Sequence, residues 1–333
     1  MHLASSERTN LATNRNLLKK LIYLLAVMAV ISIIGAILCV FAEKNGNGEE
    51  NDTGSLQVVT SFYPMYILTG NLLKSSGATV YNMTTGLSGC IHDYQVTTDD
   101  MKRLTGADVF VVNGMGMESF LSKVAAKIPN LTVFAASGVT DGAADENGHL
   151  WMNPRTYLEE LDRLYSDFSD YYEKNGMNDK IAVLYSDYSE YREEIQAVID
   201  DYEGLSECIP QGIGVICYNE AFEPYAIGLG MDIIAVFSLD EDETPSAGEV
   251  ADCIEKAKNY DTVLIFIEED LAYNADKVVT ETGAETVFLN PLTSGSGDTG
   301  SYTEIMTGNI SLTEDAIRRK RKSENKRILS SPK

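Results

Sequence analysis

Positive charge and histidine are scarce in this 333-residue chain. Only 26 lysines and arginines stand against 50 acids, and there are three histidines. The formal net charge of −24 opposes binding to phosphates, which excludes a nucleic-acid partner. The five cysteines include no CxxC pair, which argues against a thiolate zinc site or a redox dithiol. The chain also lacks GxxxxGK[ST] and HExxH, the usual phosphate-binding loop and zinc-hydrolase helix.

The charge is divided unevenly along the chain. Residues 43–317 hold 48 acids and 14 bases, whereas both ends are basic. Residues 21–42 form an uncharged apolar run of 22 residues, which as a helix spans ~33 Å, enough to cross a bilayer. Bases precede this run and acids follow it, so the positive-inside rule leaves the N-terminus in the cytoplasm and exports the rest. Residues 1–42 are therefore predicted to be a membrane anchor or signal.

Three further features concern the ends of the chain. Cys39 follows Ala36-Ile37-Leu38, which is similar to a bacterial lipoprotein processing site except that Leu38 is not small, so lipidation, an uncleaved anchor and an ordinary signal peptide all remain open. Residues 43–55 are polar and glycine-rich, typical of a flexible linker. The basic tail, 318–333, is expected to be a solvated, disordered end, with contact to an anionic membrane surface or cell wall as the alternative.

The body of the chain alternates apolar, β-branched runs with helical stretches. Such near-continuous apolar strands are typical of parallel sheets buried on both faces. Four strands are predicted before residue 136 and four after residue 212, at 56–60, 79–84, 108–114, 131–135, 213–218, 232–237, 262–268 and 285–290. Ligands of paired α/β lobes are expected in the cleft outside the carboxyl ends of such strands.

Between the two sets of strands the apolar residues follow a helical period. One helix begins after Pro154 and ends at Gly176, and a second, 179–204, is long enough at ~36 Å to join two lobes. We therefore predict an α/β fold with two lobes, each with a four-stranded, mostly parallel sheet, joined by one long connecting helix. The predicted N-terminal lobe is 56–178, the connecting helix 179–204 and the C-terminal lobe 205–317.

Two histidines are available for an exported site. His92 follows the second predicted strand and His149 precedes the helix that begins after Pro154, so both lie in loops. Taken alone, two loop histidines are more often surface residues, because a zinc site needs three or four ligands. The sequence leaves two possibilities for Cys208 and Cys217. They form a disulfide outside the cell, or Cys217 is packed, unbridged, in a buried strand.

Several segments, in order along the chain, together form a more specific pattern. They are VVTSFYPMYIL at 58–68, the run from Ile91 to Val124, HLWMNP at 149–154, NEAF at 219–222, TPSAGEV at 244–250, ETGAETVFLNPL at 281–292 and SYTEIMTGN at 301–309. This set resembles the extracytoplasmic metal-binding subunit of zinc and manganese ABC importers. The resemblance implies two α/β lobes that bind one metal ion between them, hand it to a membrane permease and catalyse no reaction.

The resemblance also implies a set of metal ligands. His92 matches the first family histidine, and His149 matches the second, which precedes a Trp-x-x-Pro stretch. The third ligand, a histidine or glutamate in the family, is Asn219 here with Glu220 beside it, and the fourth, usually an aspartate, is Asn290. An amide offers only a neutral oxygen, so the two asparagines weaken the expected site unless Glu220 turns inward.

We therefore expect a monomeric, membrane-tethered receptor on the extracytoplasmic face of a bacterial cell, which binds a divalent ion and delivers it to an ABC permease. Two imidazoles favour Zn²⁺, whereas amide and carboxylate oxygens favour Mn²⁺ as the alternative ion. A degenerate relative that serves as a surface adhesin or scaffold is a second hypothesis. A zinc hydrolase with Glu220 as base ranks last, because no catalytic constellation is present.

Overall fold

The computed structural model describes residues 55–85, 91, 94–140, 147–238, 244–295 and 301–330, with only the backbone for 301 and 323–330. These residues belong to one compact unit that begins at Ser55. The predicted anchor at 21–42 lies outside the described residues. Within them, no helix is both long and apolar enough to cross a membrane.

Two four-stranded sheets organise the described chain, as the sequence predicts. The first has the order β2-β1-β3-β4 and the second β6-β5-β7-β8, and every strand pair in both is parallel. The strands are β1 (Gln57–Thr60), β2 (Thr79–Asn82), β3 (Val109–Val112), β4 (Thr132–Ala135), β5 (Ile213–Cys217), β6 (Asp232–Val236), β7 (Thr262–Ile267) and β8 (Glu285–Phe288). We call the first sheet with the helices between its strands the N-lobe, and the second sheet with the helices between its strands the C-lobe.

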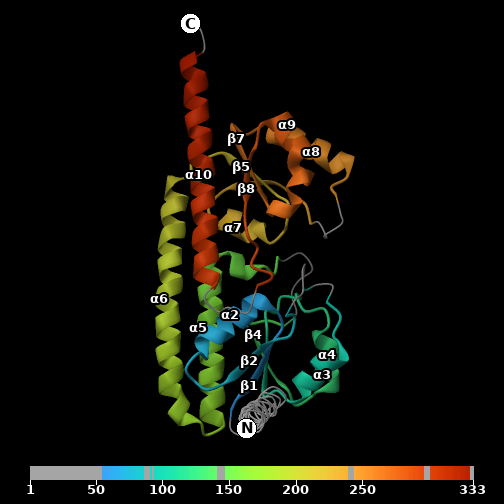
Figure 1. Cartoon of the computed structure of the whole chain (residues 1–333), viewed down its shortest axis with the longest axis vertical. Helices are drawn as coiled ribbons and strands as arrows, with labels where there is room; N and C mark the ends of the chain where they lie inside the picture. The colour runs from blue at the N-terminus through green and yellow to red at the C-terminus, as the bar shows by residue number, and fades with distance from the viewer. Residues whose placement is uncertain are drawn as a thin grey trace, which may run out of the picture. The chain divides into compact units, whose positions relative to one another are not determined.

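Helices fill the connections between the strands (Figure 1). The N-lobe contains α2 (Tyr63–Leu72), α3 (Thr98–Thr105) and α4 (Leu121–Lys127), and the C-lobe contains α7 (Phe222–Gly228), α8 (Ala247–Ala257), η3 (Glu269–Ala275) and α9 (Asp276–Thr282). Local sequence sets several of their ends. Thr97 and Asp100 form a capping box at α3, and Ser246 and Glu249 form another at α8.

Three long helices link the lobes. They are α5 (Pro154–Lys174), α6 (Asn178–Cys208) and α10 (Ser301–Ser330), and α6 packs against both of the others. The connecting helix is longer at its C-terminal end than predicted, because Gly204 does not end it: Leu205, in the next position, is buried and holds the last turn. A short 3₁₀ turn, η2 (Leu150–Met152), precedes α5.

The basic tail differs from the expectation. We expected a disordered end from residue 318, but α10 continues as a helix through Ser330. Two observations explain the continuation. Arg318 pairs with Glu314 one turn earlier, and no proline stands between residue 301 and Pro332.

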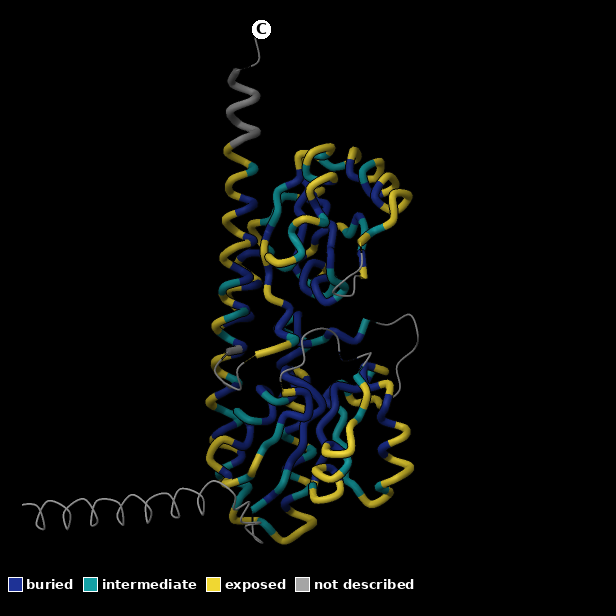
Figure 2. Tube along the Cα trace, turned by 45° about the vertical axis from the view of Figure 1, so that its right-hand side comes forward, coloured by how far each residue is buried: buried dark blue, intermediate teal, exposed yellow. Residues whose placement is uncertain are grey.

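A smaller hydrophobic cluster lies within the C-lobe, whereas apolar residues from both sheets and from the three long helices form the main core. The main core includes Val58 of β1, Phe168 of α5, Ile195 of α6, Phe266 of β7 and Met306 of α10, all almost inaccessible to solvent. Figure 2 shows buried residues, in dark blue, running through both sheets. The boundaries that the sequence suggests between the lobes remain predictions.

The cysteines in the described residues are unbridged. Cys208 is exposed, Cys217 is buried in β5 and Cys253 is buried in α8. The Cys208–Cys217 disulfide left open by the sequence is therefore not formed, and Cys217 is a packed core residue. Burial raises the pKa of both buried thiols, that of Cys253 to about 11, so neither is a reactive thiolate at neutral pH.

Candidate metal centre

Polar side chains follow each strand of the C-lobe sheet at its carboxyl end. Asn219 follows β5, Ser238 follows β6, Glu268 follows β7 and Asn290 follows β8. The parallel strands bring these four loops to one edge of the sheet. This edge is where an α/β sheet binds its ligands.

The side chain of Asn219 is held at both of its polar atoms. Its Oδ1 accepts a hydrogen bond from the backbone N–H of Ala221 at 2.9 Å, which shapes the turn into α7. Its Nδ2 donates to Oε1 of Glu268, also at 2.9 Å. The loops after β5 and β7 are thus joined by an amide and a carboxylate.

Glu220, the predicted anionic ligand, lies beside Asn219 but has different neighbours. It is half-buried, and its Oε2 accepts a hydrogen bond from the hydroxyl of Ser238 at 3.0 Å. Its side chain is therefore engaged with the loop after β6, an edge strand of the C-lobe sheet.

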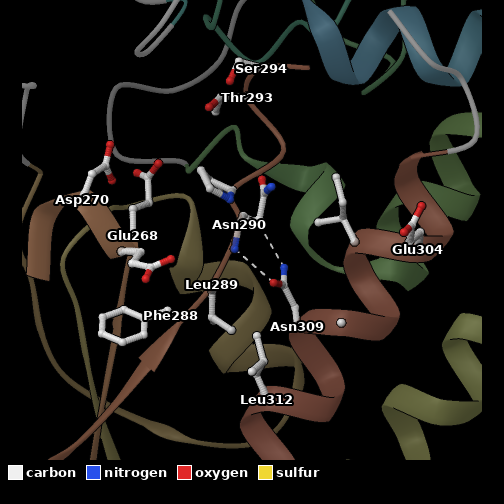
Figure 3. Close-up of a pocket in the computed structure, with 14 residues that line it drawn as sticks. Glu268, Asp270, Phe288, Leu289, Asn290, Thr293, Ser294, Glu304, Asn309 and Leu312 are labelled. Atoms are coloured by element: carbon white, nitrogen blue, oxygen red, sulfur yellow. Dashed lines mark hydrogen bonds between the residues drawn. The ribbon is translucent and has the colours of Figure 1, made fainter. Parts of the chain in front are cut away.

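Asn290 is exposed and occupies a tightly specified loop. Its Oδ1 accepts from the N–H of Leu292 at 2.8 Å, and Leu292 itself has a left-handed backbone with φ 61°. Asn309 of α10 clamps the Asn290 backbone by donating from Nδ2 to its carbonyl at 2.9 Å and accepting from its N–H at 3.0 Å. Figure 3 shows both bonds as dashed lines.

A pocket of about 520 Å³ opens beside these residues (Figure 3). Its lining comes from the loop after β7, the loop after β8 and the first turns of α10. Glu268 and Asn290 both contribute to it, together with the exposed acids Glu269 and Asp270.

His149 is 2% exposed and is oriented by Asn147. Asn147 Nδ2 donates to two acceptors, the carbonyl of Glu220 and Oε2 of Glu223, each at 2.9 Å. This fixes the orientation of the amide, so its Oδ1 faces His149 and accepts from both the backbone N–H at 3.0 Å and the ring Nδ1 at 2.8 Å. This bond calls for a proton on Nδ1, the arrangement that hydrogen-bonded histidine ligands use when Nε2 coordinates a metal.

The His149 segment also contacts the loop that holds Asn290. Trp151 packs against His149, with ring centroids 5.0 Å apart, and its Nε1 donates to the carbonyl of Pro291 at 2.9 Å. The hydroxyl of Tyr302, on α10, donates to the Trp151 carbonyl at 3.0 Å. Three candidate positions, 149, 220 and 290, are thus linked through direct neighbours.

A loop of the N-lobe contacts the His149 segment, because Asn113 donates from Nδ2 to the carbonyl of Gly148 at 3.0 Å. Glu118 is buried and accepts hydrogen bonds from the Ser61 hydroxyl and from the N–H groups of Asn113 and Gly114, at 2.7, 2.8 and 3.0 Å. These bonds tie the ends of β1 and β3 together. The pKa of Glu118 is raised because burial outweighs the bonds that lower it.

His92, the first predicted ligand, lies outside the described residues, although the preceding Ile91 is buried in the core. Among the residues that are described, no three histidine, cysteine, aspartate or glutamate side chains lie close enough to hold a metal ion. The structure brings His149, Asn219, Glu220 and Asn290 to neighbouring loops, and their grouping around one ion remains a prediction.

Sequence reasoning missed two residues of this region. Asn147 precedes His149 by only two positions, and an asparagine so close to a candidate ligand was a signal that could have been read. Glu268 is 49 positions from Asn219 and meets it only because β5 and β7 are neighbours in the sheet. The predicted strand included Glu268 as its last residue, so Glu268 was not considered as a residue of the following loop.

A family model described as "ZnuA: Zinc-uptake complex component A periplasmic" matches residues 58–316. Among curated proteins, the chain is 25% identical over 290 residues to the zinc-binding lipoprotein AdcA of Streptococcus pneumoniae serotype 4, covering 80% of this chain and 56% of that protein. It is 26% identical over 294 residues to the high-affinity zinc uptake system protein ZnuA of Bacillus subtilis, covering 79% and 88%. The chain thus spans little more than half of AdcA.

Solved structures show the same fold. The Zn(II)-bound ZnuA-like domain of Streptococcus pneumoniae AdcA matches with a TM-score of 0.66 and 25% identity over 79% of this chain and 99% of that domain. The binding protein FpvC from Pseudomonas aeruginosa in complex with Mn²⁺ matches with a TM-score of 0.68 and 20% identity over 80% and 99%.

Proposed function

This chain belongs to the ZnuA family of zinc-uptake components, and from that premise we propose that it captures a divalent metal ion between its two lobes and delivers it to an ABC permease. The family description is that of an uptake component and names no reaction, in agreement with a binding protein rather than an enzyme. The observation that carries the proposal is the placement of His149, a buried imidazole whose Nδ1 is held by Asn147 in a segment bonded to the loops after β5 and β8.

The proposed ligands are those that the sequence suggests. His149 and His92 supply neutral imidazoles, and Asn219, Glu220 and Asn290 complete the shell from the C-lobe. The Asn147 and Trp151 bonds, which connect the His149 segment to the loops after β5 and β8, support a shared site.

Zinc is the proposed ion. Two imidazoles suit Zn²⁺ better than Mn²⁺, which prefers an all-oxygen shell. Of the relatives above, AdcA is described as zinc-binding and the ZnuA-like domain as Zn(II)-bound. Mn²⁺ is the alternative, since the C-lobe donors are oxygens.

The proposed location is the extracytoplasmic face of the membrane. The apolar run at 21–42 and the bases before it support an exported body tethered by the N-terminal segment. The description of AdcA as a lipoprotein supports lipidation at Cys39 as one means of tethering.

Calorimetry of the purified chain with Zn²⁺ and with Mn²⁺ tests the proposal. We expect heat of binding and a rise in Tm with both ions, larger for zinc, because an ion that binds only the folded state stabilises it. The double variant His92→Ala/His149→Ala should lose both effects. Absence of heat and of a thermal shift in the unaltered protein with either ion would refute metal capture.

A second candidate is a surface scaffold that has lost transport. It is favoured by the asparagines, because Asn219 and Asn290 both use their side-chain oxygens to shape their own loops. Growth at limiting zinc separates the two functions. A scaffold leaves growth unchanged in the double histidine variant, whereas a receptor makes growth depend on those histidines.

A further inference from the structure

The topology of the C-lobe marks one place on its sheet for a ligand. From β5 the chain moves outward to β6, then returns across β5 to β7 and continues to β8. The connections on the two sides of the β5–β7 boundary therefore run in opposite directions. Such a boundary is a switch point, where the two loops diverge and leave a crevice at the carboxyl ends of the strands.

Glu268 and Asn219 are the side chains that meet across this boundary. Asn219 donates to Oε1 of Glu268 at 2.9 Å, and Glu268 is half-buried. Glu268 also lines the 520 Å³ pocket that includes Asn290 from the loop after β8 (Figure 3). In the strand order β5-β7-β8, the carboxylate lies between the two asparagines.

A divalent cation at this edge needs negative charge. If amides and imidazoles alone bound it, the full charge of +2 would be partly removed from water without compensation, which is costly. Glu220 is less well placed to supply that charge, because it bonds to Ser238 after β6, on the side of β5 away from the switch point.

We propose that Glu268 is an anionic ligand of the bound divalent cation, supplying the charge that Asn219 and Asn290 do not carry. This inference rests on the proposed function. A carboxylate has about four lone-pair sites, so it can accept the Asn219 bond and coordinate an ion at the same time. The Asn219 amide then orients the carboxylate, as hydrogen-bond partners of metal ligands commonly do.

Glu268→Gln tests the proposal, with Glu269→Gln as the matched control. Glu269 is the next residue, is exposed and lines the same pocket, so the control removes the same charge from nearly the same place. In a competition titration with a zinc chelator, we expect Glu268→Gln to weaken zinc binding at least about tenfold, since even outer-shell partners of a metal contribute that much. Glu269→Gln should stay within about twofold, as expected for an exposed charge.

Cobalt substitution separates a ligand from a distant charge. The visible absorption of bound Co²⁺ depends on the atoms that coordinate it, so Glu268→Gln should change the spectrum and Glu269→Gln should not. If Glu268→Gln does not fold, Glu268→Asp, which keeps the charge on a shorter side chain, should still shift the cobalt spectrum and weaken zinc binding.

The outcomes distinguish this inference from the proposed function. If the unaltered protein binds neither zinc nor cobalt, the proposed function fails and the inference fails with it. If the unaltered protein binds both and Glu268→Gln binds zinc equally well, Glu268 is not a ligand while the receptor function stands. Weaker zinc binding with an unchanged cobalt spectrum also overturns the proposal, because Glu268 then affects binding without coordinating the ion.

Discussion

At the residue scale, Asn147 joins two segments that are distant in the sequence. Its carbonyl oxygen selects the tautomer of His149, and its amide nitrogen holds Glu220 and Glu223 at the start of α7. One side chain thus orients the His149 imidazole and bonds its segment to the C-lobe.

The tautomer can be tested without any metal. In the metal-free protein at neutral pH, ¹⁵N NMR should show the His149 proton on Nδ1, and only three histidines need to be assigned. Asn147→Asp keeps the acceptor and should keep this tautomer, whereas Asn147→Ala removes it and should give a mixture. Asn147→Ala should also weaken zinc binding about 10-fold. A proton on Nε2 in the unaltered protein would contradict the assignment.

Part of this site was predictable from the sequence. His149, Asn219 and Asn290 fall in loops at the expected edge, because strand patterning and the following turns are local features. The partners of these residues are not local. Asn219 finds Glu268 through the pairing of β5 with β7, and Asn290 finds Asn309 through the packing of α10, so neither bond could be read from spacing.

At the element scale, α10 positions the loop after β8. Asn309, 2% exposed, makes two hydrogen bonds to the backbone of Asn290. All eight strands were predicted, with ends within two residues of those observed, because buried parallel strands have apolar runs that stop at polar residues. The helical tail was not predicted, because a run of bases alone indicates solvation rather than conformation.

Asn309→Ala tests the role of α10. It leaves the Asn290 N–H and carbonyl without their partner, so the free energy of unfolding should fall by about 1–3 kcal/mol in urea titrations. Zinc affinity should fall as well, since the Asn290 loop loses its anchor. Asn259→Ala is the control, because Asn259 is exposed and makes one bond within its own turn, and it should change stability by less than about 0.5 kcal/mol. Equal losses in the two variants would argue against a positioning role.

At the scale of the whole molecule, the core contains a carboxyl group without a partner. Glu160 of α5 is 2% exposed, and neither carboxyl oxygen accepts or donates a hydrogen bond. Burial raises its pKa well above the ordinary value; nearby Glu118 raises it further and Arg163 opposes the shift. Because the folded state holds this proton more tightly than the unfolded state, the resulting stability is complete below the unfolded pKa and is lost as pH rises through the folded pKa.

Replacing the carboxyl by a neutral amide should remove that loss. Glu160→Gln should be more stable than the unaltered protein at pH 8, and the difference in Tm should shrink toward pH 4, near the pKa of glutamate in an unfolded chain. Thermal unfolding across this range measures the difference. Glu159→Gln, at the exposed neighbouring position, should show no such trend. A destabilised Glu160→Gln at pH 8 would show that the carboxylate is ionised and stabilising in the folded protein.

The main core has a consequence for how the chain folds. Tyr302, near the start of the last helix, stacks on Tyr157 with ring centroids 3.6 Å apart, and Met306 packs in the same cluster as Val58 of the first strand. The main core is therefore complete only when the last helix has packed. Contacts of such long sequence separation fold slowly, and partly made chains expose apolar surface meanwhile.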